Sequence, residues 1–278
     1  MLNGLKVAVV LPGINVAPTL ERTISALPKG VADDMIFVDD GSSDGSGEIA
    51  RSLGARVFVH RKNLGYGAAQ KTGYREALAA GAGVVVMVHP DFQYKPELMP
   101  AIGSMVAFGG YDLVLGSRVL LKGAMKGGMP AWKFVANRGL THLENAMLGV
   151  GISEYHTGYR AFSRRLLEAL PLAENRNDYA FDNETIAQTV SLGFSIGEMS
   201  CPTLYFDGMQ TISFKGAIRY GFGCLNVASR YVLHRAGVKP TPQFTREGRG
   251  LSAWTEGAPL KEPTARSRPD HPPRVPRS

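Results

Sequence analysis

The sequence predicts an α/β fold in which a mostly parallel sheet is flanked by helices. Short apolar runs of the kind that form buried strands recur through the first 118 residues. Segments with helical spacing of apolar residues separate these runs, and turns rich in Gly, Pro, Asn or Asp follow several of them. Strands that alternate with helices in this way indicate βαβ units, so we expect neighbouring strands to run parallel.

Five strands and three helices are expected in this first half. The first strand, Lys6–Leu11, is a β-branched run that stops at Pro12-Gly13, and Gly83–Val88 is the strongest buried run of the chain. The Ala-rich stretch 68–80 has helical character and follows the glycine-containing turn 63–67. In chain order we expect strands at 6–11, 35–39, 56–59, 83–88 and 113–115, and helices at 19–27, 42–53 and 68–80.

The stretch Met35–Gly45, M-I-F-V-D-D-G-S-S-D-G, joins one of these strands to a polar turn. Ligands of open parallel sheets bind outside the carboxyl ends of the strands, which is where Asp39 and Asp40 stand. The two aspartates could instead serve only to cap the next helix, because Asp and Ser are common helix caps. We therefore treat the pair as a candidate binding site with a structural alternative.

The pattern changes after residue 118. A Gly-, Met- and Lys-rich stretch at 122–129 has the composition of a mobile loop. Helical spacing predicts helices over 131–148, from Ser163 onward and over 182–190, and a late strand over 195–202. We expect residues 1–213 to form one domain.

The C-terminal part divides into a helix and a tail. Phe214–Ala236 has apolar residues at helical spacing with basic residues around them, and we treat 214–238 as an amphipathic segment. Such a helix either lies on a membrane surface or docks on the domain with its polar face in solvent. Residues 239–278 are basic, rich in Pro and poor in large apolar groups, so we expect a disordered tail.

Composition narrows the class of protein. A hydrophobic content of 44% with 20% charged residues is ordinary for a globular chain. The net charge of +7 is compatible with phosphate, anionic lipid or nucleic-acid partners, although part of it lies in the tail. Of these three, we expect no nucleic-acid partner. Two cysteines do not make a disulfide framework, and no secretory signal or long apolar run is recognisable. We expect a cytoplasmic protein.

Two further features stand at predicted strand ends or turns. Asp91 follows the fourth strand and Gln93 lies two positions later, so both side chains can face one side of an extended backbone. A carboxylate and an amide oxygen suit a hard cation such as Mg²⁺ that shares ligands with substrate phosphates. The turn at Gly65 either lets the backbone approach an anion or is only a tight turn.

Basic residues follow these carboxylates along the chain. Together with a cation they could stabilise a diphosphate leaving group, or each could be a surface residue with no partner. The chain has neither a dinucleotide-binding glycine fingerprint nor a P-loop, which excludes the commonest phosphate-binding motifs. The residues concerned are Arg118, Lys133, Arg138 and Arg160.

These motifs resemble those of the family-2 glycosyltransferases of the GT-A fold. The similarity covers about residues 4 to 235 and rests on V-D-D-G-S-S-D-G, N-L-G-Y-G, D-F-Q and G-S-R. T-G-Y-R-A-F-S at 157–163 and F-D-N-E at 181–184 are most similar to the dolichyl-phosphate mannosyltransferase-like branch. The resemblance implies a GT-A-type, Rossmann-like sheet that binds an NDP-sugar (a UDP- or GDP-sugar) at its carboxyl edge.

The same resemblance implies roles for individual residues. Asp91 and Gln93 would hold Mg²⁺ or Mn²⁺ on the diphosphate, and Arg118 and Arg160 would lie near the diphosphate or an acceptor phosphate. The candidate catalytic residues are Asp91, Arg118, Arg160, Asp182 and Glu184. The candidate donor-binding residues are Pro12, Asn15, Asp39, Asp40, Gly41, Gly65, Lys71 and His89.

This chain departs from the family pattern at two positions. His89 stands where the metal motif usually begins with an acidic residue, giving H-P-D instead of D-x-D, and His is not a preferred ligand of Mg²⁺. Val16 follows Asn15, where relatives often place an acidic residue. The identity of the metal, and whether the reaction strictly requires one, therefore stay open at this point, and the contacts to the nucleotide base can differ from those of relatives.

The expected reaction is an inverting transfer of a hexosyl unit to an acceptor. A polyprenyl phosphate acceptor is already anionic and needs no general base, whereas a hydroxyl of a glycan or soluble acceptor must be deprotonated. Asp182 or Glu184 could act as that base, or could only favour a helix N-terminus. A nucleotidyltransferase and a non-catalytic sugar-nucleotide-binding protein are the alternatives, and a lipid acceptor would bring the chain to the inner face of the membrane.

Overall fold

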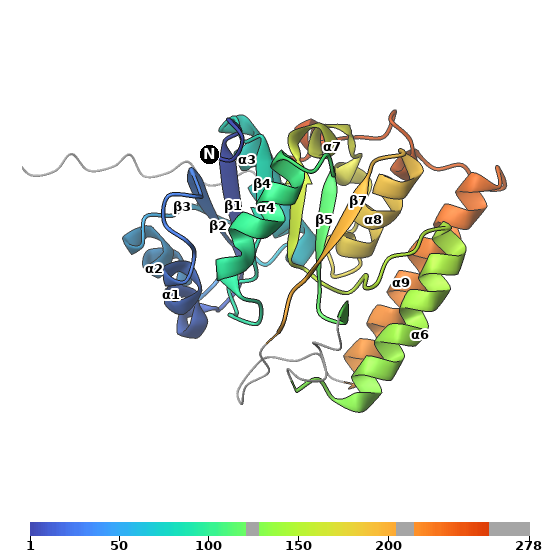
Figure 1. Cartoon of the computed structure of the whole chain (residues 1–278), viewed down its shortest axis with the longest axis horizontal. Coiled ribbons are helices and arrows are strands. Elements are labelled where there is room, and N and C mark those ends of the chain that lie inside the picture. The colour runs from blue at the N-terminus through green and yellow to red at the C-terminus, as the bar shows by residue number, and fades with distance from the viewer. Residues whose placement is uncertain (121–127, 204–213, 256–278) are drawn as a thin grey trace, which may run out of the picture.

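The computed structural model describes residues 1–120, 128–203 and 214–255, and Figure 1 shows one sheet with helices on both faces. Its strand order is β3-β2-β1-β4-β6-β5-β7. The α/β fold predicted from the sequence is therefore confirmed. The strands are β1 (Val7–Gly13), β2 (Asp34–Asp39), β3 (Arg56–Val59), β4 (Val84–Met87), β5 (Leu113–Ser117), β6 (Arg160–Ser163) and β7 (Ile196–Ser200).

The sheet is mostly parallel, with one strand reversed. β1 pairs in parallel with β2 and β4, β2 with β3, and β5 with β7. β6 runs antiparallel between β4 and β5. The sequence did not predict this strand, because its four residues begin with the fully buried Arg160, which interrupts the apolar pattern.

Two hydrophobic cores lie on the two faces of the sheet. In β1, Val7 and Val9 belong to the core beneath α1, α2 and α4, whereas Ala8 and Val10 belong to the core beneath α3, α7 and α8. This alternation is the two-residue period of a strand that is buried on both sides. The helices are α1 (Ala17–Ser25), α2 (Ser46–Ser52), α3 (Tyr66–Ala79), α4 (Met99–Ala107), α6 (Ala131–Leu148), α7 (Arg164–Ala169), α8 (Phe181–Ser191) and α9 (Phe214–Arg235).

Most predicted elements differ from the observed ones by a few residues at their ends. One such difference concerns β1, which continues through Pro12 and Gly13 instead of stopping at Leu11. The carbonyl of Val10 accepts a hydrogen bond from Val88 at the end of the pairing with β4, and Pro12 faces the same side two residues later. The missing N–H of Pro12 therefore falls beyond the ladder, where a strand tolerates proline.

The C-terminal part packs on the domain further than expected. α9 lies beside α6 and also contacts α8, as Figure 1 shows for the first pair. After it, Gln243, Phe244, Leu251 and Trp254 are all buried. The prediction of a disordered tail from residue 239 was therefore wrong for 239–255, because these few widely spaced groups pack although the composition is poor in apolar residues. Residues 256–278 lie outside the described part of the chain.

Two further predictions concern a loop and the possibility of a membrane span. The mobile loop expected at 122–129 falls mostly on residues 121–127, which lie outside the described residues. Within the described ranges, none of the helices combines the length and the apolarity that a bilayer crossing requires.

Candidate functional site

The carboxyl edge of the sheet brings together segments that are far apart in sequence. The parallel strands β1, β2, β4, β5 and β7 end there, and the antiparallel β6 begins there. The turn that precedes β6, residues 155–159, therefore lies at the same edge as the turn after β4. Glycine at 158 is required for this approach, because a Cβ on Gly158 would lie 1.8 Å from the Nε2 atom of His89.

The turns after β1 and β2 form one hydrogen-bonded unit. The backbone amide of Asn15 donates to the Oγ atom of Ser42 at 2.9 Å, and the amide of Ser43 donates to the Oδ1 atom of Asn15 at 2.9 Å. Asn15 adopts a left-handed conformation, with φ of 53°. The structure thus places the candidate donor residues Pro12, Asn15 and Asp39 at one end of two paired strands.

The two aspartates of the opening motif have different surroundings. Asp39 accepts a hydrogen bond from the amide of Ser42 at 2.7 Å. Asp40 accepts hydrogen bonds from the amides of Leu64 and Gly65 and contacts the Nδ1 atom of His60 at 2.6 Å. Three partners for one carboxylate are enough to explain its burial, so Asp40 holds the loop between β3 and α3.

Two of the candidate glycines are explained by backbone geometry. Gly41 and Gly65 have positive φ values of 85° and 103°, which side chains rarely adopt. A Cβ on Gly65 would also lie 2.4 Å from the carbonyl oxygen of Asn177. The tight-turn interpretation is therefore sufficient for the segment that contains Gly65.

Lys71 is engaged by groups of the protein itself. It is fully buried, and its Nζ atom donates to the carbonyl of Asn175 and to the Oδ1 atom of Asn177 at 2.9 Å. The same Nζ atom lies 4.3 Å from the ring centroid of Trp254. These contacts tie α3 to the loop before α8 and to the C-terminal segment, which is a structural task.

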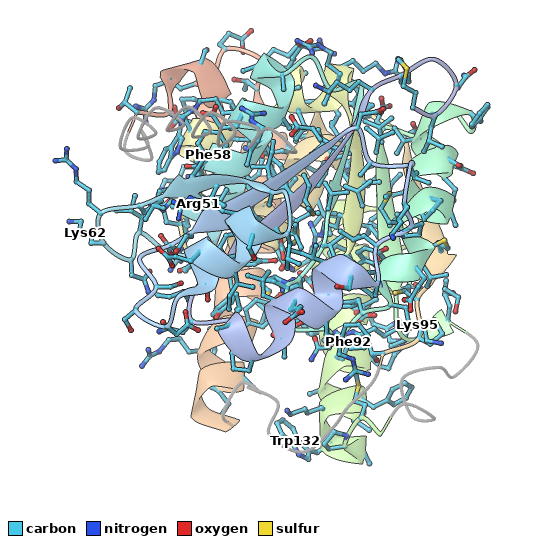
Figure 2. The ribbon with its side chains drawn as sticks, turned by 90° about the vertical axis from the view of Figure 1, so that its left-hand side faces the viewer. Arg51, Phe58, Lys62, Phe92, Lys95 and Trp132 are labelled. Atoms are coloured by element: carbon cyan, nitrogen blue, oxygen red, sulfur yellow. The ribbon has the colours of Figure 1, made fainter. Side chains whose placement is uncertain are left out.

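The turn after β4 carries the candidate metal ligands. The Oδ1 atom of Asp91 accepts a hydrogen bond from the amide of Gln93 at 3.0 Å, and Phe92 between them has φ of 57°. Figure 2 shows Phe92 and Lys95 in this region. No cluster of three or more His, Cys, Asp or Glu side chains that could hold a metal occurs among the described residues. Asp91 and Gln93 fit a hard cation that takes its other ligands from diphosphate and water.

His89 is the first residue of a hydrogen-bonded chain that leads to α8. Its Nε2 atom lies 3.1 Å from the hydroxyl of Tyr66, and that hydroxyl donates to the Oδ2 atom of Asp182 at 2.9 Å. The Nε2 atom of Gln70 donates to the other oxygen of Asp182 at 3.1 Å. The carboxylate of Asp182 is therefore engaged on both oxygens.

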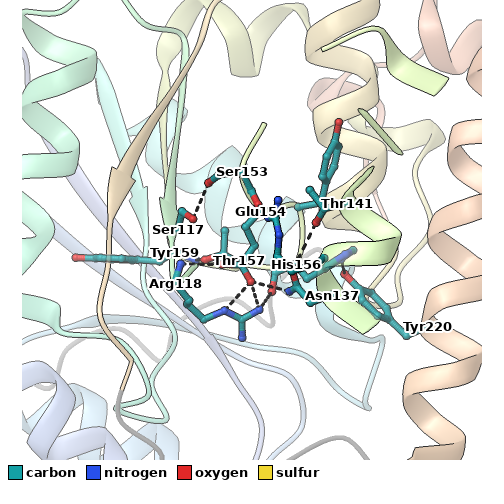
Figure 3. Close-up of polar contacts among 12 residues, drawn as sticks. Ser117, Arg118, Asn137, Thr141, Ser153, Glu154, His156, Thr157, Tyr159 and Tyr220 are labelled. Carbon is teal, nitrogen blue, oxygen red and sulfur yellow. Dashed lines mark hydrogen bonds and ion pairs between the residues drawn. The ribbon is translucent and has the colours of Figure 1, made fainter. Parts of the chain in front are cut away.

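Arg118 forms a buried ion pair with Glu154 (Figure 3). Its Nε atom donates to Glu154 at 2.8 Å, and its backbone amide donates to the second oxygen at 2.7 Å. It also donates to the carbonyl of His156 at 2.7 Å. Burial raises the pKa of Glu154, but the charge and hydrogen bonds of Arg118 outweigh that effect, so the pKa lies below its usual value. For Arg118, the alternative that it is a surface residue without a partner is therefore excluded.

Arg160 is a second arginine with a structural role. Its side chain has no exposed surface, and it donates to the carbonyls of Tyr155, Thr157 and Asp182 at 2.7 to 3.0 Å. These bonds join the turn before β6 to the start of α8. Because Arg160 is fully buried and donates to three protein carbonyls, its placement does not support the expected position near a diphosphate or an acceptor phosphate.

Glu184 also lies in the interior. It is fully buried, accepts a hydrogen bond from the amide of Arg176 at 2.7 Å and contacts Arg230 of α9 at 3.3 Å. Burial raises its pKa. Asp182 and Glu184, the two candidate general bases, are therefore both held by protein partners and shielded from solvent.

The structure also reveals a buried polar cluster that the sequence did not indicate. Tyr220 of α9 donates to Asn183 at 3.0 Å and lies 3.2 Å from the Nδ1 atom of His156. Glu144 of α6 accepts a hydrogen bond from Asn183, and its other oxygen lies 3.4 Å from the Nε2 atom of His156. Burial raises the pKa of Glu144 to about 8 and lowers the pKa of His156 to about 4. A protonated Glu144 therefore faces a neutral His156.

Comparison with known proteins gives the family. Residues 8–170 match the model of glycosyl transferase family 2. An uncharacterised protein of Methanocaldococcus jannaschii is 30% identical over 73% of this chain and 84% of its own length. The undecaprenyl-phosphate mannosyltransferase of Micrococcus luteus is 30% identical over 70% of this chain and 82% of its own length. The polyprenol monophosphomannose synthase of Mycolicibacterium smegmatis is 33% identical over 59% of this chain and 64% of its own length.

Solved structures support the fold. The glucosyl-3-phosphoglycerate synthase of Mycobacterium tuberculosis, crystallised with UDP, superposes with a TM-score of 0.64 over 85% of this chain and 82% of its own. It is 23% identical, so the similarity concerns the fold alone. The family match and the names of the sequence relatives confirm the resemblance to the dolichyl-phosphate mannosyltransferase-like branch. The chain belongs to glycosyl transferase family 2 and is a glycosyltransferase.

Proposed function

We propose that the chain transfers a hexosyl unit from a UDP- or GDP-sugar to a polyprenyl phosphate, with inversion at the sugar C1 atom. A non-bridging oxygen of the acceptor phosphate attacks C1 while the bond between C1 and the diphosphate oxygen breaks, and NDP leaves. Because the acceptor oxygen is already anionic, this reaction needs no general base.

The proposal rests mainly on the two candidate general bases, because both carboxylates are already bound by other groups of the protein. Asp182 accepts hydrogen bonds from Tyr66 and Gln70, and Glu184 is buried against Arg176 and Arg230. A hydroxyl acceptor would require one of these carboxylates to take a proton. An acceptor phosphate does not, and relatives named for undecaprenyl phosphate and polyprenol support the same choice.

Asp91 and Gln93 would hold the divalent cation against the donor diphosphate, and a cation there would stabilise the charge of the leaving group. Structures of the neighbouring synthase with UDP and either Mg²⁺ or Mn²⁺ support a divalent cation for the fold. Arg118, fixed by Glu154, would lie next to the acceptor phosphate at the same edge.

A lipid acceptor also requires contact with a bilayer, and we propose that α6 and α9 supply it at the inner face of the membrane. Trp132 and Val135 near the start of α6 and Ile218 and Phe222 near the start of α9 are 43 to 70% exposed. Both helices begin at the end of the molecule to which the carboxyl edge of the sheet points, and Figure 2 shows Trp132 there. Exposed apolar groups at this end could enter a lipid surface beside the site.

Release of NDP from a panel of UDP- and GDP-hexoses tests the reaction. The acceptors are a polyprenyl phosphate, 3-phosphoglycerate and an oligosaccharide, each with and without EDTA. We expect release only with the polyprenyl phosphate, and its loss in Asp91→Ala but not in the exposed control Glu168→Gln. Release with the oligosaccharide alone would favour a hydroxyl acceptor, and release of pyrophosphate would favour a nucleotidyltransferase.

Flotation with anionic liposomes tests the membrane contact. We expect the chain to float with the vesicles and the double variant Trp132→Asp/Phe222→Asp to remain in the dense fraction. Phe108→Asp is the matched control, because Phe108 is 66% exposed at the far end of α4. Equal flotation of both variants would contradict the proposed surface.

A further inference from the structure

We infer that the Nδ1 nitrogen of His89 is a ligand of the divalent cation that binds with the donor diphosphate, so that this chain prefers Mn²⁺ to Mg²⁺. The inference rests on the proposed function and concerns the position where H-P-D replaces D-x-D. The inference gives His89 a role in metal binding, whereas the loss of the acidic residue alone would indicate a weakened metal site.

The hydroxyl of Tyr66 decides the tautomer of His89. Tyr66 has one proton to donate, and it donates it to Asp182, because a carboxylate can only accept. The Nε2 atom of His89, 3.1 Å away, must therefore carry a proton and donate it to the oxygen of Tyr66.

The other ring nitrogen of His89 is then an acceptor. In a neutral imidazole with the proton on Nε2, the lone pair lies on Nδ1. No described residue forms a hydrogen bond with Nδ1, and Nδ1 is not one of the buried polar atoms that lack a partner. The lone pair is thus open to a ligand, two residues before Asp91.

The ring is also held in one orientation. It stacks on Tyr66 with ring centroids 5.6 Å apart and packs against Tyr94 at 5.5 Å. On a third side the backbone at Gly158 leaves no room for a Cβ. A histidine that donates from one nitrogen to a chain ending in a carboxylate, and is fixed by its neighbours, has the second shell typical of metal-binding histidines.

The nitrogen ligand explains the metal preference. Carboxylate and amide oxygens serve Mg²⁺ and Mn²⁺ alike, whereas imidazole binds better to the transition metals of the Irving–Williams series, which begins with Mn²⁺. Replacing the first carboxylate of D-x-D by an oriented imidazole therefore changes the metal ligands from oxygen atoms alone to a mixture of nitrogen and oxygen atoms. Asp91 and Gln93 remain the oxygen donors.

Pulsed electron paramagnetic resonance of Mn²⁺ bound to the full chain with UDP or GDP tests the inference without turnover. We expect nitrogen modulation from a coordinated imidazole, which changes frequency when histidine is labelled with the heavy nitrogen isotope. The modulation should persist in His142→Asn, an exposed histidine of α6, and vanish in His89→Asp. His89→Asp should still bind Mn²⁺ and should gain affinity for Mg²⁺ relative to Mn²⁺.

Tyr66→Phe provides a second variant. It removes the acceptor of the Nε2 proton, and we expect about tenfold weaker Mn²⁺ binding with nucleotide, as for other second-shell changes. Binding of Mn²⁺ with nucleotide but without nitrogen modulation in the wild-type chain would overturn the inference. If the same protein still released NDP with polyprenyl phosphate, the proposed function would stand, so the two failures are distinguishable.

Discussion

The carboxylate of Glu154 accepts hydrogen bonds from both the guanidinium and the backbone amide of Arg118, and neither oxygen of Glu154 is exposed. The pair connects the end of β5 to the turn that precedes β6. Arg118 therefore acts as an oriented cation whose charge is balanced by one buried anion.

Glu154→Gln should destabilise the fold and weaken acceptor binding. The amide cannot balance the charge of Arg118, and breaking a buried ion pair from one side costs about 3 kcal/mol. Chemical denaturation should detect that loss, and KM for polyprenyl phosphate should rise. The exposed pair of Glu168 and Arg164 gives a control, because Glu168→Gln should cost at most about 1 kcal/mol. Equal stability of the two variants would refute the assigned role of Glu154.

The same pair predicts a loss of stability in acid. Because the folded pKa of Glu154 is lowered, the ion pair stabilises the native state fully above the unfolded value. This contribution disappears as the pH falls through the folded pKa. In Glu154→Gln, the decrease in unfolding free energy below about pH 4.5 should therefore be shallower than in the wild-type chain.

Arg160→Lys should lose stability although the charge is kept. Lysine presents one ammonium group, whereas the guanidinium donates to three carbonyls on two segments. Each buried carbonyl left without a donor costs about 1 to 3 kcal/mol, so we expect a loss of at least about 2 kcal/mol by urea denaturation. Nucleotide affinity of the folded variant should stay within a factor of about three, which corresponds to a change in binding free energy of less than about 1 kcal/mol. A much larger loss of affinity would mean that Arg160 contacts the donor.

Glu144→Gln should stabilise the protein at alkaline pH. Since burial raises the folded pKa to about 8, the native state keeps a proton that the unfolded chain releases above its usual value of 4.5. The contribution of Glu144 to the stability of the wild-type chain should therefore decrease as the pH rises from about 4.5 to about 8. The glutamine can accept from Asn183 and donate toward His156 at every pH.

Urea midpoints at pH 5 and at pH 8.5 would measure this difference. The gain of Glu144→Gln over the wild-type chain should be larger at the higher pH. Glu97→Gln, at an exposed position before α4, should follow the wild-type curve. A gain that does not depend on pH would show that Glu144 is ionised throughout.

Gly158→Ala should impair the metal site more than the fold. A Cβ there would lie 1.8 Å from the Nε2 atom of His89 and 2.8 Å from the hydroxyl of Tyr66, so the pair must separate. We expect about tenfold weaker Mn²⁺ binding with nucleotide by calorimetry. In Gly139→Ala the Cβ would meet nothing within 4 Å, and a helical alanine should leave binding unchanged and stability equal or higher. Normal binding by Gly158→Ala would contradict the packing described.

The sequence predicted the frame of the site because parallel strands bring their carboxyl ends to one edge. Asp39 is the last residue of such a strand, and Asn15, Asp91 and Gln93 lie in the turns after two others, so their placement at one edge needed no knowledge of long-range contacts. β6 was not predicted because Arg160 interrupts its apolar pattern. The packing of Phe244, Leu251 and Trp254 on the domain was not predicted because so few residues of 239–255 are large and apolar.

The partners of the charged residues could not be predicted in the same way. Arg118 and Glu154 are separated by 36 residues, and Lys71 lies 106 residues before Asn177. Nothing in the local pattern distinguishes an arginine that will meet a phosphate from one that will hold carbonyl groups. The packing of α6, α8 and α9 determines which of the two an arginine does. The same packing gives Asp182 and Glu184 their protein partners.

The linkage in the product tests the central claim most directly. After incubation with the active donor and polyprenyl phosphate, the lipid product would be isolated and its anomeric proton and phosphorus signals recorded by nuclear magnetic resonance. We predict a sugar C1 bonded to a phosphate oxygen, with an anomeric configuration opposite to that of the donor. A sugar linked to a hydroxyl, or one with the configuration of the donor, would contradict inverting transfer to a lipid phosphate.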